Sequence, residues 1–376
     1  MNPGDHLVDV ERGQTSYRVE DALEVGERFQ IAELYDEEEQ RVVVARAILY
    51  GDESLDEAGV ERRRVGLRRQ WRFLEALGGQ SLVPEPVDWV EVELSPVEMP
   101  PEPLLICEKI DGPTLYEWIT DEFPRGMDVD RALELLTSLV AFLEAAHQER
   151  WMWRDFDPRR FRIADGQICA VSLGGILEVG EDGDVGEGAL NIDYIAPELR
   201  DGAPAKMQHP AADLYGAGAL LSFLLSGEEP RHRVESPLSY EAYERIEERD
   251  IPGVDLLLAR LLQPMAEKRL SSAEQLLDYC DVDALPTRED EGFEQCELPA
   301  PWLGLDMEDP EKNRGLRSRL SAGPLVSMKR EGGQKADPSQ KPTPGDEGPG
   351  ELDWRMVAVV VVATLLIVAV GIIVGA

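Results

Sequence analysis

The stretch Trp151–Ile163, WMWRDFDPRRFRI, decides how the rest of the chain is interpreted. It follows Asp130–Glu149, in which apolar residues recur at helical spacing. Pro158 predicts a turn within the stretch, and Asp165-Gly166 predicts a hairpin just after it. The stretch is therefore expected to form a loop that is held between a helix and a hairpin.

Composition limits the classes of ligand. The 376 residues include 75 acidic and 38 basic side chains, which give a net charge of -37. Binding to DNA or RNA needs a basic surface, so nucleic acid is not expected as a partner. The four cysteines lie far apart without a C-x-x-C motif, and neither a disulfide framework nor a metal site is predicted.

The pattern of apolar residues divides the chain into segments. Residues 17–108 are predicted to form short strands interrupted by one helix near Glu61–Leu77, and residues 109–283 to be mostly helical. This pattern predicts an α+β fold of two lobes, preceded by a flexible segment over residues 1–16. Residues 284–353 are rich in Pro, Gly, Ser and charge, which is typical of a disordered linker.

The last segment, residues 354–376, is predicted to be a transmembrane helix. Met356–Ala376 are 21 residues without charge, and at ~1.5 Å per residue they match a hydrocarbon layer of ~30 Å. Because the nearby basic residues precede this helix, the folded domain is expected in the cytoplasm. Within the linker, Pro301-Trp302-Leu303 is expected to dock on the domain; the alternative is a short interaction motif.

Several motifs occur in order along residues 17–282. They are Leu105–Glu108 with Asp111–Leu115, Trp153-Arg154-Asp155 with Pro158, Gly174, Ala196-Pro197-Glu198, Asp213–Gly218 and Arg269. Together they resemble the eukaryotic-type serine/threonine protein kinase domain, of the kind also found in bacterial membrane kinases. The resemblance implies a two-lobed kinase fold.

The resemblance also assigns roles to individual residues. It places Cys107 as gatekeeper of a nucleotide site and Glu108 at the hinge between the lobes. It implies that Asp213 braces the backbone of the Trp151–Ile163 loop. It further implies an ion pair between Glu198 and Arg269.

The sequence departs from the family where phosphates and metal ions are bound. The family uses a strand lysine paired with a helix glutamate, and an aspartate and an asparagine that hold magnesium. Here Arg46 replaces the lysine and Gln70 replaces the glutamate. Ser172 replaces the metal-binding aspartate and Arg160 the asparagine, so no metal is expected. Of the glycine-rich loop, Gly26 remains.

Two residues of the loop keep the family's identity. Asp155 stands at the position of the catalytic base, but without both metal ligands a vestigial, structural role is favoured. Arg154 stands where the family binds a phosphorylated activation segment, yet no Ser, Thr or Tyr occurs from Leu173 to Asp193. The same segment contains the acidic residues Glu178, Glu181, Asp182, Asp184 and Glu187. One of them is expected to pair with Arg154; the alternative is a solvated acidic loop.

These departures indicate a membrane-anchored pseudokinase that acts as a signalling scaffold or allosteric regulator. Its expected partners are the membrane and other signalling proteins, such as a kinase or a phosphatase substrate, and no cofactor is expected. One alternative is an active but atypical serine/threonine kinase, which would need ATP and magnesium, with Asp155 as base and Arg46 on the phosphates. Another is a passive interaction module that is read through the Trp302 region and the linker.

Overall fold

The structure is a computed structural model. It describes residues 1, 3–10, 14–25, 29–48, 57–79, 82–92, 101–180, 190–200, 209–231 and 236–299, all within the compact unit Met1–Gly304. The predictions for Gly26, for Pro301-Trp302-Leu303, for the rest of the linker and for the membrane helix concern residues outside these ranges. No helix within the described ranges is both long and apolar enough to cross a membrane.

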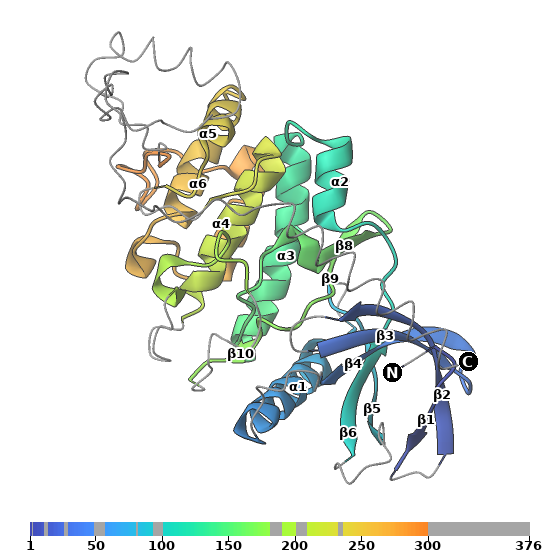
Figure 1. Cartoon of the computed structure of the whole chain (residues 1–376). Coiled ribbons are helices and arrows are strands. Elements are labelled where there is room, and N and C mark those ends of the chain that lie inside the picture. The colour runs from blue at the N-terminus through green and yellow to red at the C-terminus, as the bar shows by residue number, and fades with distance from the viewer. Residues whose placement is uncertain are drawn as a thin grey trace, which may run out of the picture. The chain divides into compact units, whose positions relative to one another are not determined.

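The N-terminal lobe is an antiparallel sheet with one helix. Its strands are β1 (His6–Asp9), β2 (Gln14–Val25), β3 (Phe29–Asp36), β4 (Arg41–Ile48), β5 (Pro86–Val92) and β6 (Glu102–Glu108). They pair in the order β1-β2-β3-β4-β6-β5, and Asp9 opposite Val92 closes the sheet into a barrel (Figure 1). The barrel has a core of its own, which includes Val19, Leu34 and Ile106.

The prediction that residues 1–16 are flexible is wrong for the part that the structure describes. His6–Asp9 form β1, in which Leu7 and Asp9 are buried and the residues between them are exposed. This alternation is the pattern of a strand with one buried face. Pairing with both β2 and β5 satisfies backbone groups that would otherwise form an open sheet edge.

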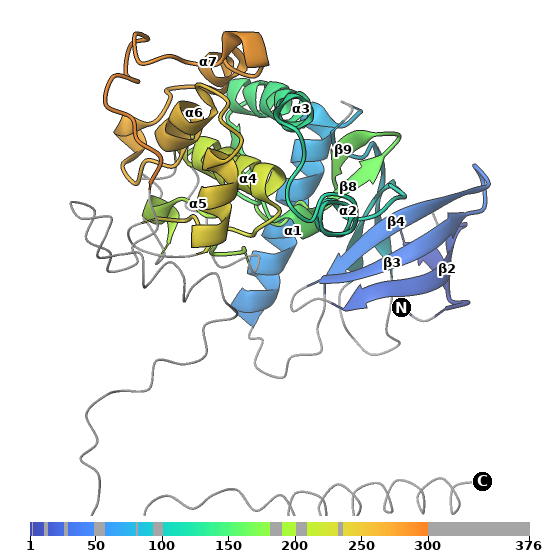
Figure 2. The same cartoon turned by 90° about the horizontal axis from the view of Figure 1, so that it is seen from above.

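Helix α1 (Glu57–Leu77) joins the two lobes. Its residues Leu67, Phe73 and Leu74 are buried in the main core, together with residues of the helical lobe. Phe73 packs edge-on against Phe142, with ring centroids 6.0 Å apart. Figure 2 shows α1 running between the sheet and the helices. The position of α1 is therefore set by both lobes.

The C-terminal lobe is mostly helical, as the sequence predicts. Its α-helices are α2 (Leu115–Glu122), α3 (Val129–Gln148), α4 (Ala211–Ser226), α5 (Tyr240–Glu247), α6 (Val254–Leu261) and α7 (Ala273–Leu277). The short strands are β7 (Trp151–Met152), β8 (Phe161–Ala164), β9 (Gln167–Ala170) and β10 (Leu177–Glu178), and single turns of 3-10 helix are η1 (Pro158–Arg160), η3 (Pro197–Leu199), η5 (Ala266–Lys268) and η6 (Val282–Ala284). Strands β8 and β9 form the predicted hairpin, with Asp165 and Gly166 both at positive φ in its turn.

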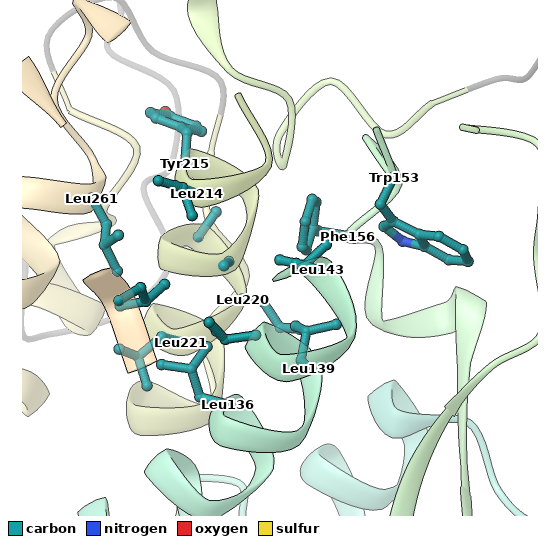
Figure 3. Packing of buried hydrophobic residues seen from close by; sticks show 14 of the residues in the cluster. Leu136, Leu139, Leu143, Trp153, Phe156, Leu214, Tyr215, Leu220, Leu221 and Leu261 are labelled. Atoms are coloured by element: carbon teal, nitrogen blue, oxygen red, sulfur yellow. The ribbon is translucent and has the colours of Figure 1, made fainter. Parts of the chain in front are cut away.

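Helix α4 is the centre of this lobe, and every one of its residues is buried. Leu220 and Leu221 face Leu136 and Leu139 of α3, and the ring of Phe156 lies close to the same helices (Figure 3). Gly216 makes this contact possible, because a Cβ there would lie 2.1 Å from the Phe156 ring. The Trp151–Ile163 loop is thereby packed directly onto α4.

The folded lobe extends further than predicted. Residues 284–299 were expected to belong to a disordered linker, but Phe293 is fully buried and Leu285, Cys296 and Leu298 are buried with it. The ring centroids of Phe293 and Tyr279 are 5.2 Å apart, and Ser236 Oγ donates a hydrogen bond to the Pro299 carbonyl at 2.7 Å. The segment folds because its few apolar residues cover the helical core, although its overall composition is polar and charged.

Candidate active site

The backbone of the Trp151–Ile163 loop is held by one buried carboxylate. Asp213, at the start of α4, is 0% exposed and accepts hydrogen bonds from the backbone N–H groups of Trp153 at 2.9 Å and Arg154 at 2.7 Å. His147 Nε2 lies 2.9 Å from the same carboxylate. Arg154 has φ of 63°, a strained value for a residue with a side chain. The bracing contact that the family resemblance implied is thus present, and it fixes this strained residue.

Trp153 takes the place of the family's histidine and belongs to the core. It is completely buried, and its indole Nε1 donates to the Asp155 carbonyl at 2.5 Å. Its ring packs against Phe73 of α1 and Phe142 of α3, with centroids 5.9 and 5.5 Å away. The large side chain therefore links the loop to both lobes.

Asp155 is buried and lies beside both of the changed metal positions. Only 4% of it is exposed, and burial raises the pKa of its carboxyl to about 6. Two neighbouring groups oppose this rise in the pKa. The Nε atom of Arg160 lies 3.9 Å from Oδ2 of Asp155, and the Ser172 hydroxyl donates a hydrogen bond to the Asp155 carboxylate. The candidate base thus has a cation and a hydroxyl as neighbours.

The side chains at this position do not fit a magnesium ion. Magnesium takes hard oxygen ligands, usually including one or two carboxylates. Here Ser172 offers a neutral hydroxyl, and Arg160 places a fixed positive charge against Asp155. Among the described residues there is no group of three or more His, Cys, Asp or Glu side chains that could hold a metal.

Arg46 on β4 reaches across to the segment that leads to Ser172. Its Nη2 atom donates to the carbonyl of Val171, the residue that directly follows β9. It also lies beside the Cys107 thiol, whose pKa is raised by burial, against the opposing effect of the Arg46 cation. The arginine that replaces the family's lysine is therefore bound to protein backbone at the cleft.

Gln70 lies buried on α1, with 4% of its surface exposed. In the part of the chain that the structure describes, its side-chain Oε1 accepts no hydrogen bond. A neutral amide cannot supply the negative charge of the family's glutamate. At the position where the resemblance expects this glutamate, the helix therefore carries a buried neutral side chain.

A cavity of about 420 Å³ opens between the sheet and the helical lobe at these residues. Ile31, Val44 and Val171 supply apolar walls, and Arg46, Cys107, Glu108, Arg160 and Ser172 are among the other lining residues. The structure thus brings together the predicted nucleotide and metal positions that it describes, apart from the buried Gln70.

Lys109 is a contact at this cavity that the sequence did not single out. Its Nζ atom lies 2.9 Å from Glu33 Oε1 on β3 and 3.0 Å from Asp111 Oδ1 beyond the hinge. Hydrogen bonds to these two carboxylates raise the pKa of Lys109. Its being the only lysine before Lys206 was the available signal.

A second unpredicted network surrounds Arg159. Its guanidinium binds both carboxylate oxygens of Glu229, at 2.6 and 3.1 Å, and lies 3.7 Å from the centre of the Tyr116 ring. Asp157, which caps η1, receives hydrogen bonds from Arg159 at 3.3 Å and from Asn191 at 3.2 Å. These contacts tie the loop to α2, to the segment after α4 and to the Asn191 region.

The acidic segment was expected to pair with Arg154. Arg154 Nε donates to the Gly175 carbonyl at 2.6 Å, and Gly175 is needed there because a Cβ would lie 2.5 Å from the Trp153 carbonyl oxygen. Glu178 lies 3.3 Å from Arg72 of α1. The other four acidic residues of that prediction lie outside the described ranges, so the prediction stays open for them.

Glu198 and Arg269 form the ion pair that the resemblance implied. Nη1 of Arg269 lies 2.5 Å from Oε1 of Glu198, and Nη2 lies 2.7 Å from Oε2. The Arg269 side chain is 0% exposed. Arg269 also donates to the carbonyls of Ala211, Gln263 and Pro264. Of the remaining motif residues, Pro158 is buried in η1, and Gly174 is partly buried two residues after Ser172.

Comparison with known proteins points to one class. No family model matches the chain. The probable serine/threonine-protein kinase PknB of Lactococcus lactis is 26% identical over 129 residues, 34% of this chain and 20% of that protein. The serine/threonine-protein kinase PksC of Streptomyces coelicolor is 25% identical over 197 residues, 47% of this chain and 34% of that protein. The chain therefore matches about a third or less of these curated relatives' length.

The fold agrees with this class. The crystal structure of the Mycobacterium tuberculosis PknI kinase domain superposes with a TM-score of 0.51 at 20% identity, covering 70% of this chain and 95% of that one. A mutant of the same domain superposes with a TM-score of 0.54 at 18% identity, covering 74% of this chain and 97% of that one. The described unit has the protein kinase fold. The chain is a relative of the bacterial eukaryotic-type serine/threonine protein kinases.

Proposed function

We propose that this chain is a pseudokinase, a kinase-shaped domain that transfers no phosphate. The observation that carries the proposal is the ion pair between Arg160 and Asp155, with the Ser172 hydroxyl bonded to the same carboxylate. Phosphoryl transfer needs divalent cations to neutralise charge between the phosphates. An arginine and a serine at the two metal positions repel such a cation or fail to bind it.

The test is thermal unfolding of the purified chain with ATP, with magnesium, and with both. We expect no rise in melting temperature that requires ATP and magnesium together, because a ligand stabilises only a state that binds it. A clear rise with both, which is lost in R160A or S172A, would overturn the proposal. Arg125→Ala serves as the matched control, since Arg125 is 78% exposed and lies on the helical lobe.

A second candidate function is that of an active, atypical serine/threonine kinase. Asp155 favours it, because a carboxyl whose pKa is about 6 suits a general base near neutral pH. This kinase would need ATP and magnesium, with Arg46 on the phosphates. Phosphate transfer to a protein hydroxyl that disappears in Asp155→Asn would establish it over the pseudokinase.

As a pseudokinase the chain would act as a scaffold or allosteric regulator for other signalling proteins, held at the membrane by Met356–Ala376 with its domain in the cytoplasm. The sequence of that segment supports this part of the proposal. The competing proposal is a passive module, in which partners bind the linker and the folded domain takes no part in the interaction. Deleting residues 300–353 leaves the folded segment up to Pro299 in place, and loss of partner capture on deletion would favour the passive module.

A further inference from the structure

Helix α1 is strongly basic, although the chain as a whole is acidic. Six arginines lie within eleven consecutive residues of this helix, at positions 62, 63, 64, 68, 69 and 72. The whole chain has a net charge of -37. A positive helix on such a chain provides a local field that attracts negative groups.

The outer face of α1 borders an apolar groove. A cavity of about 500 Å³ is lined by Val65, Arg68, Trp71, Arg72 and Trp89, the last of these from β5. The two indole rings lie 6.0 Å apart at 51° to each other, and Val65 is 42% exposed. Aromatic rings beside arginines are the combination that is enriched at the centres of protein interfaces.

Two arginines at the rim of the groove, Arg68 and Arg72, are exposed to solvent, where they can bind carboxylates. Arg72 lies over the Trp151 ring at 5.7 Å and binds the Glu178 carboxylate at 3.3 Å, with 51% of its side chain exposed. Arg68 is exposed one helical turn away, beside Val65. The groove therefore offers an apolar floor and a cationic edge at the same place.

We propose that this groove docks an acidic segment of a partner protein, one that carries a bulky apolar side chain between its carboxylates. The apolar side chain fills the space between Val65, Trp71 and Trp89, and the acids meet Arg68 and Arg72. The inference deepens the proposed function and rests on it, since it names the chemistry of the partner that a signalling scaffold would bind. Charge complementarity selects an acidic occupant.

The docking site lies on α1, which also reaches the kinase-like cleft. Gln70 and Phe73 are buried on the same helix as Trp71 and Arg72. The ring of Phe73 packs against that of Trp153, with the ring centroids 5.9 Å apart. An occupant that shifts α1 would thus act on the loop that carries Asp155. This link gives a physical route from a bound partner to the cleft.

The test uses the full chain in detergent and a fluorescein-labelled probe peptide with a Trp and a Leu among Asp and Glu residues. Binding is measured by fluorescence anisotropy without nucleotide. We expect saturable binding that weakens with added salt, and a loss of about tenfold in affinity or more for the double variant V65D/R68E. The matched control is V282D/R125E, because Val282 is 37% exposed and Arg125 is also exposed.

Four outcomes would overturn the proposal. They are equal binding by both double variants, equal binding of a peptide whose acids are replaced by Lys, self-association of the chain that V65D/R68E abolishes, and capture of phosphatidylserine vesicles in place of the peptide. Circular dichroism of both double variants checks folding. Since no nucleotide is present, a negative result here leaves the magnesium and ATP test of the proposed function unaffected.

Discussion

The Asp155 carboxylate lies 3.9 Å from Nε of Arg160, in a loop that leaves 4% of Asp155 exposed. Burial dominates over this attraction and raises the pKa of the carboxyl from 3.8 to about 6. The folded chain therefore binds this proton more tightly than the unfolded chain. As pH rises from about 4 to about 6, ionisation of Asp155 lowers the stability of the fold, and above that range the penalty is complete.

Asp155→Asn should consequently stabilise the chain at neutral pH. We expect a gain of up to about 3 kcal/mol above pH ~7, falling toward zero near pH ~4. Urea unfolding of both chains across this pH range measures it. Asp278→Asn, which changes an exposed carboxylate, is the control. A gain that does not depend on pH would show that Asp155 is not the titrating group.

Asp213→Ala should destabilise the fold by about 3 kcal/mol, because two buried backbone N–H groups lose a charged acceptor and the strained conformation of Arg154 loses the contact that fixes it. Asp213→Asn should cost less, since one side-chain oxygen remains to accept. Denaturant unfolding gives both values. Equal effects of Ala and Asn would mean that the side chain acts only by filling space.

Breaking the ion pair between Glu198 and Arg269 should also be costly. Glu198→Ala leaves a guanidinium with a 0% exposed side chain without its carboxylate, and we expect a loss of about 3 kcal/mol. Replacing both residues, as in E198A/R269M, should cost less than the sum of the two single changes. A double-mutant cycle measures the coupling, and additive losses would contradict it.

Phe293→Ala tests whether the segment after Leu285 belongs to the domain. Phe293 is fully buried against Tyr279, and removing its ring should cost about 3 kcal/mol. Removal of an exposed apolar side chain, as in Val282→Ala, is the control. If differential scanning calorimetry shows the same melting temperature for both variants, the segment does not stabilise the core.

Restoring the two metal positions should restore metal binding in part. In R160N/S172D the cation beside Asp155 is removed and a carboxylate is added, so the site gains the oxygen ligands that magnesium prefers. We expect magnesium with ATP to raise the melting temperature of this variant by about 2–4 °C. The single variant S172D, which keeps Arg160, is the control and should show a smaller rise or none.

Local patterns predicted much of the fold. The helical spacing in Asp130–Glu149 corresponds to α3, and Asp165-Gly166 forms the predicted turn between β8 and β9. The limits of the domain were predicted less well. His6–Asp9 and the Phe293 region were assigned by composition, and composition does not show whether a few apolar side chains have a surface to pack against.

The candidate site was predicted from identity, since Arg46, Gln70, Arg160 and Ser172 were recognised as changes at family positions. Their contacts were not predictable. Arg46 binds the Val171 carbonyl, a contact between residues 125 positions apart that only the folded chain brings together. Lys109 with Glu33 and Arg159 with Glu229 were missed for the same reason.

The sequence by itself showed that Trp151–Ile163 resembles a kinase loop, and that Arg160 in this loop and Ser172 after it stand where the resemblance expects metal ligands. The tertiary structure decided what occupies the site: Arg160 and Ser172 both face Asp155, whose pKa burial raises. It also placed Trp71 of α1 beside Trp89 of β5 and Arg72 over Trp151. Side-chain identity is local, whereas burial, charge pairing and grooves arise from residues that are distant in the chain.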